Sequence, residues 1–362
     1  MHALVTAELT SEAQHTLEHE FGWHVTTDHM ALHTAASTGK LPAGAAECDV
    51  VIIEADSINR TLLDALPRLR LIGCVRGEPA NVDIAAATAR GIPVLYAPGR
   101  NAEAVADFTL ALVLASLRHI AQTHHLIVTG ALTEEAALGS TNRADVVWRY
   151  RESDRVHPYT LYKGPELRTQ TLGVVGFGSV GCRVADKAVR LGMHVLVHDP
   201  YVDAPEIGRA GCRPVALDQI LQESDIISLH ARGSSAPLLG ERELRLMKRG
   251  AYLVNTARAV LVDYNALYRV LRDGHMAGAA LDVFPVEPLP PNSPFLMLPN
   301  VTLTPHIAGA STNVKEHQSQ ILIANLRALL HEGDKNALAV KNPETLHDWL
   351  ADDGRRRDER MS

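Results

Sequence analysis

The chain has 362 residues, of which 46% are hydrophobic and only 4% aromatic, and its formal net charge is -7. This length predicts two domains with aliphatic cores. The acidic balance argues against a general nucleic-acid binder, and no apolar run approaches the ~20 residues of a membrane span. The N-terminus lacks a basic region followed by a long apolar one, so we expect no signal peptide. The four cysteines are scattered without C-x-x-C spacing, which predicts a reduced, cytoplasmic protein without a metal site: Cys48, Cys74, Cys182 and Cys212.

The first hundred residues alternate between strand-like and helix-like segments. Strands are predicted at Ala3–Ala7, Asp49–Glu54, Leu69–Val75 and Ile92–Tyr96. Helices are predicted from a capping box at Ser11 to about Phe21, and over Asn59–Leu66 and Val82–Ala89. This alternation predicts a parallel sheet with helices on both faces.

The middle of the chain begins with an unusually long helical pattern, Ala102–Val128, which could connect two domains. Residues 129–170 are polar and weakly periodic, which suggests a surface excursion or an oligomer contact. The strand–helix rhythm returns over 171–305, with later strands predicted at Ile226–Leu229, Ala251–Asn255, Gly278–Leu281 and Val301–Thr304. A last helix, Glu316–Leu330, is expected to return to the first domain, and the charged end of the chain, 352–360, is expected to be disordered.

A glycine-rich turn carries the most specific signal. The apolar run Leu172–Val175 leads into Gly176, Gly178 and Gly181, a helix is predicted over Val180–Leu191, and the strand Met193–Val197 precedes Asp199. In a dinucleotide-binding unit the first glycine permits a tight turn, the second lets a pyrophosphate approach the backbone, and the third lets the helix pack on the strand. The free N–H groups of the helix would face the phosphates, and Asp199 would accept the ribose hydroxyls of NAD and repel the 2′-phosphate of NADP. The alternative is a glycine-rich turn without a ligand.

Three later segments place ionisable groups just after predicted strands, where open α/β sheets bind their ligands. Arg258 follows the first, Asp282 and Glu287 follow the second, and His306 follows the third. Taken singly, they could be a surface arginine, turn carboxylates and a buried structural histidine. Together they suit the reduction of a 2-keto acid by NADH. Arg258 would grip the carboxylate, His306 would act as the acid, and Glu287 would fix the imidazole tautomer and favour its protonated form.

Positions from about 50 to 325 resemble the D-2-hydroxyacid dehydrogenase family, which includes phosphoglycerate dehydrogenase and glyoxylate reductase. The motifs that carry the resemblance are Gly91–Val94, Asn101–Asp107, the glycine turn, Asn255–Arg258, Asp282–Pro288 and Thr304–His306. The resemblance implies two doubly wound α/β domains, with a Rossmann NAD-binding domain (103–305) inserted into a flavodoxin-like substrate domain (1–102 and 306–335). A C-terminal tail would occupy 336–362. It also implies a homodimer or homotetramer that acts on a small 2-hydroxy or 2-keto acid, with no nucleic-acid or membrane partner.

The resemblance also implies roles for individual residues. Arg258, Glu287 and His306 would be catalytic. Contacts to NAD would come from the three glycines of the turn and from Ser179, Val180, Asp199, Thr256, Ala257, Arg258, Asp282, His306 and Ala308, with Asp282 holding the nicotinamide carboxamide. The substrate would meet Arg76, Gly77, Glu78, Arg100 and Arg258.

The chain departs from the family pattern in its substrate loop, 76–81. Glu78 stands where the family usually has glycine, and it would repel an anionic substrate unless Arg76 or Arg100 neutralises it. Whether Glu78 faces the substrate, or turns outward to pair with an arginine, is left open by the sequence. The Glu54–Ser57 segment lacks the arginines typical of phosphoglycerate dehydrogenases. A second function of another class is an NAD(H)-sensing binding protein, similar to the C-terminal-binding corepressors that share this fold.

Overall fold

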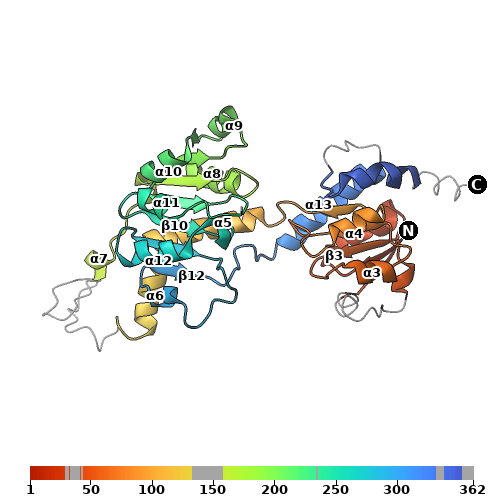
Figure 1. The fold of residues 1–362 in the computed structure, drawn as a ribbon, viewed down its shortest axis with the longest axis horizontal. Coiled ribbons are helices and arrows are strands. Elements are labelled where there is room, and N and C mark those ends of the chain that lie inside the picture. The colour runs from red at the N-terminus through yellow and green to blue at the C-terminus, as the bar shows by residue number, and fades with distance from the viewer. Residues whose placement is uncertain are drawn as a thin grey trace, which may run out of the picture. The chain divides into compact units, whose positions relative to one another are not determined.

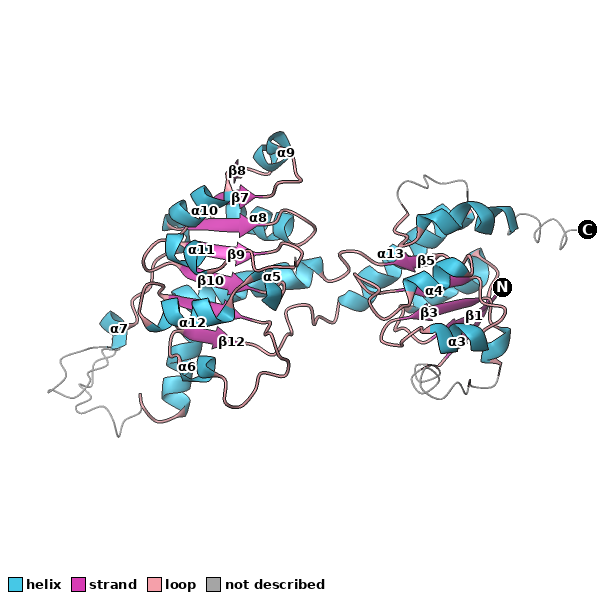
Figure 2. Cartoon of the chain, in the orientation of Figure 1, coloured by secondary structure: helices cyan, strands magenta, loops and turns pink. Residues whose placement is uncertain are grey.

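The computed structural model describes residues 1–28, 32, 41, 44–132, 158–233, 235–331 and 338–352. The chain forms two compact units (Figure 1): Met1–Asn101 together with Ser311–Ser362, and Ala102–Ala310. The boundaries between the units follow Asn101 and Ala310, whereas the expected boundaries followed residues 102 and 305. Each unit contains one parallel sheet with helices packed on it (Figure 2), which confirms the expected α/β fold class.

The first unit is built on a five-stranded sheet in the order β2-β1-β3-β4-β5, the strand order of flavodoxin-like folds. Its strands are β1 (His2–Val5), β2 (His24–Thr27), β3 (Val50–Ile53), β4 (Leu71–Cys74) and β5 (Val94–Tyr96). Its helices are α1 (Ser11–His15), the π-helix η1 (Thr16–Glu20), η2 (Ala45–Glu47), α3 (Arg60–Ala65), α4 (Ile84–Ala89), α13 (Val314–Leu330) and η7 (Pro343–Thr345). Thus α13, from the far end of the chain, belongs to the first unit.

Helices cover both faces of this sheet, because successive side chains of a strand point to opposite sides. In β3, Val51 and Ile53 pack with Leu62 and Leu63 of α3. Val50 and Ile52 pack instead with residues of α1, η1 and α13. All four β3 side chains are buried, so the continuous apolar run marks a strand enclosed on both faces.

The second unit has a seven-stranded sheet in the order β12-β11-β10-β9-β6-β7-β8, which is the doubly wound order of dinucleotide-binding folds. Its strands are β6 (Thr171–Val175), β7 (His194–His198), β8 (Arg213–Pro214), β9 (Ile226–Leu229), β10 (Tyr252–Asn255), β11 (Gly278–Leu281) and β12 (Val301–Leu303). Its helices are α5 (Ala102–Leu117), α6 (Ile120–Val128), α7 (Pro158–Leu161), η3 (Leu167–Thr169), α8 (Gly181–Arg190), α9 (Ala204–Arg209), α10 (Leu217–Glu223), α11 (Glu241–Leu246), η4 (Ala259–Leu261), α12 (Tyr264–Arg272) and η5 (Pro294–Met297).

Two separate apolar layers hold this sheet. On one face, Leu172 and Val174 of β6 pack with α5 and α8. On the other, Leu253 of β10 packs with α10, α11 and α12. All strand pairs of the sheet are parallel, so the carboxyl ends of β6, β9, β10, β11 and β12 lie along one edge.

The predicted long helix Ala102–Val128 is wrong as a single element. The structure has α5 and α6 instead, separated at His119, whose φ of 53° is left-handed. A residue in that conformation cannot continue a right-handed helix. Neither glycine nor proline stands at the break, so the sequence gives no local signal for it.

The first predicted helix also differs in detail. Its N-cap is Thr10, whose side chain accepts a hydrogen bond from Ala13 N, rather than Ser11, and its second half is the π-helix η1. Strands β2 and β8 were not predicted. β2 is mostly exposed and β8 has two residues, so neither carries a strong apolar pattern.

The expected tail at 336–362 is partly folded. Residues 338–352 pack on the first unit and include η7 and a helical stretch at 346–352, with Trp349 buried in the core. Residues 353–362, which include most of the charged end, lie outside the described residues. So do residues 133–157, the greater part of the expected surface excursion.

Candidate active site

The glycine turn between β6 and α8 has the geometry that its sequence predicts. Gly176 has a φ of 95°, and a Cβ there would lie 2.6 Å from Ala231 N. A Cβ on Gly181 would lie 1.9 Å from Gly176 O, so the close packing of the helix on the turn requires glycine. At Gly178 a Cβ would meet no protein atom within 4 Å. The missing side chain therefore leaves space above the turn, which fits the approach of a dinucleotide phosphate.

Asp199 lies at the end of β7, directly beside this turn. Its Oδ2 accepts a hydrogen bond of 2.7 Å from Phe177 N, and its Oδ1 accepts one of 2.8 Å from Tyr201 N. Each carboxylate oxygen has two lone pairs, so both can accept a further hydrogen bond. The carboxylate is thus held in place and retains the capacity to accept ribose hydroxyls.

His306 and Glu287 form a hydrogen-bonded pair. Glu287 Oε2 lies 2.7 Å from His306 Nδ1, and Glu287 Oε1 accepts a hydrogen bond of 2.9 Å from Phe284 N. Burial raises the pKa of Glu287, but the hydrogen bonds from His306 and Phe284 and the positive charges of His306 and Arg258 together leave this pKa below its usual 4.5. An ionised carboxylate only accepts hydrogen bonds, so Nδ1 carries the proton and Nε2 is the atom left for proton exchange with a substrate.

The loop that carries His306 is fixed by Asp282, a fully buried residue at the end of β11. The Asp282 carboxylate accepts hydrogen bonds from Thr304 Oγ1 (2.6 Å), Ile307 N (3.0 Å) and Ala308 N (2.8 Å). His306, between these donors, has a left-handed φ of 56°. A histidine in that region is uncommon and persists only where its surroundings hold it. In this structure Asp282 therefore acts on the position of His306.

Arg258 follows β10 in a loop organised by Asn255. The buried Asn255 side chain donates to Arg258 O (3.0 Å) and accepts from Ala257 N (3.1 Å), while the hydroxyls of Thr256 and Thr109 lie 2.8 Å apart. The Arg258 side chain is exposed, and its charge contributes to the lowered pKa of Glu287. β10, β11 and β12 are neighbours in the sheet, so Arg258, Glu287 and His306 come to one edge from three adjacent strand ends.

The comparisons with known proteins agree with this geometry. Residues 110–308 match the family model described as "D-isomer specific 2-hydroxyacid dehydrogenase, NAD binding domain". Over 354 residues the chain is 34% identical to a Bacillus subtilis protein with the provisional name 2-hydroxyacid dehydrogenase YoaD, and the match covers 96% of each chain. The chain belongs to the family of D-isomer specific 2-hydroxyacid dehydrogenases. It is therefore an NAD-dependent oxidoreductase that interconverts 2-keto acids and D-2-hydroxy acids.

Other members of the family are similar over most of the chain. A glyoxylate reductase of Aeropyrum pernix is 38% identical over 275 residues, which cover 75% of this chain and 77% of that one. A solved structure of D-lactate dehydrogenase from Aquifex aeolicus, complexed with NAD and lactic acid, has 25% identity and a TM-score of 0.64, covering 93% of this chain and 97% of that chain.

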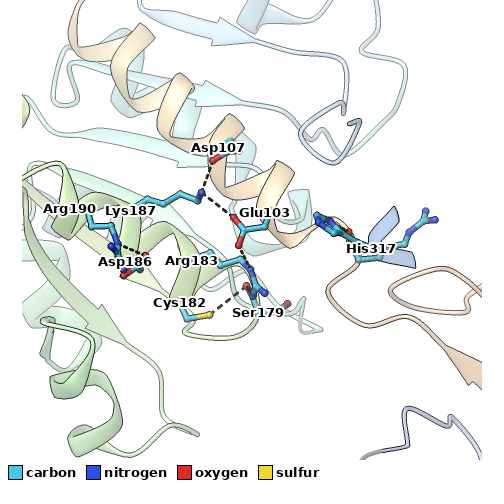
Figure 3. Close-up of polar contacts among 10 residues, drawn as sticks. Glu103, Asp107, Ser179, Cys182, Arg183, Asp186, Lys187, Arg190 and His317 are labelled. Carbon is cyan, nitrogen blue, oxygen red and sulfur yellow. Dashed lines mark hydrogen bonds and ion pairs between the residues drawn. The ribbon is translucent and has the colours of Figure 1, made fainter. Parts of the chain in front are cut away.

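An ion-pair cluster in this 2-hydroxyacid dehydrogenase links the first turns of α8 to α5 (Figure 3). Arg183 donates from Nε to Glu103 (2.9 Å) and from Nη1 to Ser179 O (2.7 Å). Lys187 pairs with Glu103 (3.0 Å) and Asp107 (2.9 Å). Glu103, Arg183 and Lys187, together with Cys182 and Asp186, line a surface pocket. The two cations of this pocket are already paired with carboxylates. The cluster holds the glycine turn against α5 and is a poor site for an anion.

His230, which follows β9 beside the glycine turn, was not among the site residues predicted from the sequence. Its Nε2 lies 2.8 Å from Ser228 Oγ, and a Cβ on Gly181 would lie 3.4 Å from its own Cβ. Burial lowers the pKa of His230 to about 3, so the ring is neutral. The available signal was its place directly after an apolar strand, the same signal that identified Arg258 and His306.

The residues expected at the substrate loop lie in the first unit. Glu78 pairs with neither expected arginine: its Oε1 lies 2.5 Å from Lys341 Nζ. Arg100 instead pairs with Glu54 at 2.5 Å and also donates to Gln318. The sequence could not indicate Lys341, because it comes from the segment expected to be a tail. At Gly77 a Cβ would come no nearer than 3.8 Å to another group, so the fold does not require glycine there.

Among the described residues, no group of three or more His, Cys, Asp or Glu side chains could hold a metal ion. No single helix in these ranges has the length and apolar composition to cross a membrane; α5 and α6 meet that test only as a pair bent by 66°.

Proposed function

We propose that His306 is the acid–base residue of this dehydrogenase, that Glu287 orients it, and that Arg258 binds the substrate carboxylate. The observation that carries this assignment is the 2.7 Å contact between His306 Nδ1 and an ionised Glu287, close enough to Arg258 for its charge to act on Glu287. NADH, when bound, supplies the hydride that adds to the carbonyl carbon. His306 Nε2 gives its proton to the carbonyl oxygen, so that the keto group becomes a hydroxyl.

Each residue has a separate task in this scheme. Glu287 stabilises the imidazolium and holds its Nδ1–H, so that Nε2 faces the reacting oxygen. The guanidinium of Arg258 can form two parallel hydrogen bonds to a carboxylate and polarise the ketone. Asp282 holds the His306 loop through three hydrogen bonds and positions the histidine rather than exchanging protons.

We further propose that Asp199 sets the preference for the cofactor NAD(H) over NADP(H). The cofactor would lie over the open backbone at Gly178, with Asp199 accepting the ribose hydroxyls. Ser179, Val180, Thr256, Ala257 and Ala308 would supply the remaining contacts. A 2′-phosphate near Asp199 would bring two negative charges together, which is unfavourable.

The proposed substrate is a small 2-keto acid, with its carboxylate also meeting the loop of Arg76 and Gly77. This loop follows β4, at the carboxyl ends of the strands of a parallel sheet, where α/β units place their ligands. Arg76 is its cation. At the end of β3, Glu54 pairs with Arg100. Arg100 is therefore not a free cation that could bind a phosphate group.

We also propose a cytoplasmic homodimer or homotetramer. Helix α6 has no buried residue, and Ile120, Ile127 and Val128 are more than half exposed, as is Leu161 of α7. A second copy covering these side chains would remove them from water. Light scattering coupled to size-exclusion chromatography tests the assembly; a monomer would refute it.

The decisive experiment is a panel of 2-keto acids assayed with NADH and with NADPH. We expect reduction of at least one small 2-keto acid, such as glyoxylate, pyruvate or hydroxypyruvate, with NADH preferred. The product should be the D-2-hydroxy acid. Absence of turnover across the panel, with NADH still bound, would favour a binding protein that senses NAD(H).

A further inference from the structure

The segment 338–342 is joined to the edge of the first unit's sheet. Val340 forms an antiparallel bridge with Leu95 of β5. Tyr96 N donates to Ala339 O (3.0 Å), and Lys341 N donates to Val94 O (2.9 Å). The backbone of this segment is therefore held in register with β5.

Asn342 locks the register. It is 1% exposed, its Oδ1 accepts from Val94 N (2.8 Å), and its Nδ2 donates to Ile92 O (2.9 Å) and Thr88 Oγ1 (3.0 Å). A buried amide with three satisfied hydrogen bonds fixes the neighbouring residue, because breaking any one of them leaves a buried polar group unpaired.

This anchoring brings Lys341 to the substrate loop. Its Nζ lies 2.5 Å from Glu78 Oε1 and 5.7 Å from the centre of the Tyr96 ring. The side chain is 36% exposed and that of Glu78 is 54% exposed. An ion pair this exposed contributes little to stability, so a stabilising role alone is a weak reason for it.

The charges at the carboxyl ends of β3, β4 and β5 give it another role. Glu54 and Arg100 cancel each other, and Lys341 cancels Glu78. In the part of the chain that the structure describes, the guanidinium of Arg76 has no hydrogen bond or ion pair. Asp56, after β3, is a buried carboxylate whose charge offsets that of Arg76. With Lys341 present this edge therefore carries no net charge, and without Lys341 it carries one net negative charge.

We propose that Lys341 is a positioning residue for the substrate, delivered by the C-terminal segment. It neutralises Glu78 and turns it away from the substrate carboxylate, so that Arg76 can act on an anionic 2-keto acid. This proposal rests on the proposed function, since it takes the loop after β4 as the site of the substrate carboxylate. It explains how a glutamate is tolerated in a loop that meets an anion.

The test compares Lys341→Gln, Lys341→Arg, Glu78→Gln and the double variant Lys341→Gln/Glu78→Gln. Lys341→Gln should raise the KM for the 2-keto acid about three- to tenfold, as expected for one unscreened charge several ångströms from an anion near the protein surface. The kcat should stay within twofold. Lys341→Arg should keep the wild-type KM, and the double variant should show much less than the effect of Lys341→Gln alone.

Two controls separate charge from structure. Arg327→Gln breaks another ion pair of the same unit, with Glu20, and should leave KM unchanged. High salt should reduce the KM difference between Lys341→Gln and wild type, because exposed charges are screened. An unchanged KM for Lys341→Gln, or an equal effect in the Glu78→Gln background, overturns the proposal while leaving the proposed function intact.

A binding measurement decides the case in which no 2-keto acid is turned over. Oxamate, an uncharged-amide analogue of a 2-keto acid that keeps the carboxylate, would be titrated calorimetrically into the NADH-bound wild type and Lys341→Gln. If wild type binds oxamate and Lys341→Gln binds it about three- to tenfold more weakly, the role of Lys341 is supported. This holds even where the absence of turnover has refuted the proposed function. Equal affinities, or no binding by either protein, overturn it.

Discussion

Among single residues, the site depends on hydrogen bonds that hold a few side chains at the ends of parallel strands. His306 has both a left-handed backbone and a carboxylate partner, and Asp282 and Glu287 supply the two constraints from the chain after β11. This arrangement leaves one ring atom, His306 Nε2, for proton exchange with the substrate.

His306→Ala removes the proton donor. General acid–base catalysis contributes typically ~10²–10⁴-fold, so the turnover rate should fall by about that factor. The dissociation constant of NADH, measured by fluorescence titration, should change little, because the side chain acts on the substrate oxygen. A variant that keeps more than a tenth of the wild-type rate would contradict the assignment.

Glu287→Gln tests the partner of the histidine. The folded pKa of Glu287 lies below 4.5, so its charge is present above that pH and is lost only as the pH falls through the lowered value. The carboxylate is thus ionised throughout the neutral range, where it accepts the Nδ1 proton of His306. Glutamine has no charge with which to hold this proton, so we expect lower reduction rates across the neutral part of the pH–rate profile. A superimposable profile would remove Glu287 from the mechanism.

Asp199→Ala tests cofactor choice. The wild-type carboxylate should disfavour the 2′-phosphate of NADPH, and removing it should narrow the NADH preference in kcat/KM by about tenfold, which corresponds to ~1.4 kcal/mol. Steady-state kinetics with both cofactors measure this ratio. A wild-type kcat/KM with NADPH comparable to that with NADH would show that Asp199 does not distinguish a ribose 2′-hydroxyl from a 2′-phosphate.

Among the structural elements, the turn between β6 and α8 contains one glycine that the fold requires and one that the proposed ligand requires. Gly181 is required by packing, since a Cβ would collide with Gly176 O, whereas the space above Gly178 is open. The two glycines of one motif therefore predict different consequences for the same substitution.

Gly178→Ala should fold with an unchanged melting temperature and bind NADH at least tenfold more weakly, because its Cβ enters only the space proposed for the pyrophosphate. Gly181→Ala should lower the stability of the second unit by about 1–3 kcal/mol or more, since overpacking forces the backbone to move. Thermal unfolding and NADH titration of both variants give the comparison. Equal losses of stability would contradict the distinction.

At the scale of the whole molecule, the two ends of the chain together complete the first unit. Helix α13 and the segment 338–352 pack on strands formed by the first hundred residues. Trp349 is 4% exposed and donates from Nε1 to Arg70 O (2.6 Å), and Arg70 also pairs with Asp352. The C-terminal segment is thereby part of the unit's core.

Trp349→Ala should reduce the free energy of unfolding of the first unit by about 3–5 kcal/mol, because it leaves a large cavity in the core. Urea unfolding followed by circular dichroism measures the change. His347→Ala, an exposed position in the same segment, is the matched control and should change stability by less than about 0.5 kcal/mol. A similar effect of both variants would mean that the segment adds little to the core.

Features that depend on local pattern could be predicted from the amino-acid sequence. The apolar runs of β3, β6 and β10 and the glycines after β6 have fixed periods and spacings, so the parallel sheets and the turn could be predicted. Arg258, Glu287 and His306 could be selected because each follows a strand, and parallel strands bring such residues to one edge.

Features that depend on contacts between distant parts of the chain could not be predicted from the sequence. The break at His119 has no glycine or proline to announce it, and the exposed strand β2 has no apolar pattern of its own. Lys341 follows the short apolar run Leu338–Val340, and nothing in that run indicates a partner for its charge. The burial of Asn342 against β5 brings Lys341 to Glu78. A local sequence pattern predicts which side chains of a strand or helix are buried. The partner of a charged side chain depends instead on how distant segments pack together, and a short stretch of sequence does not contain those segments.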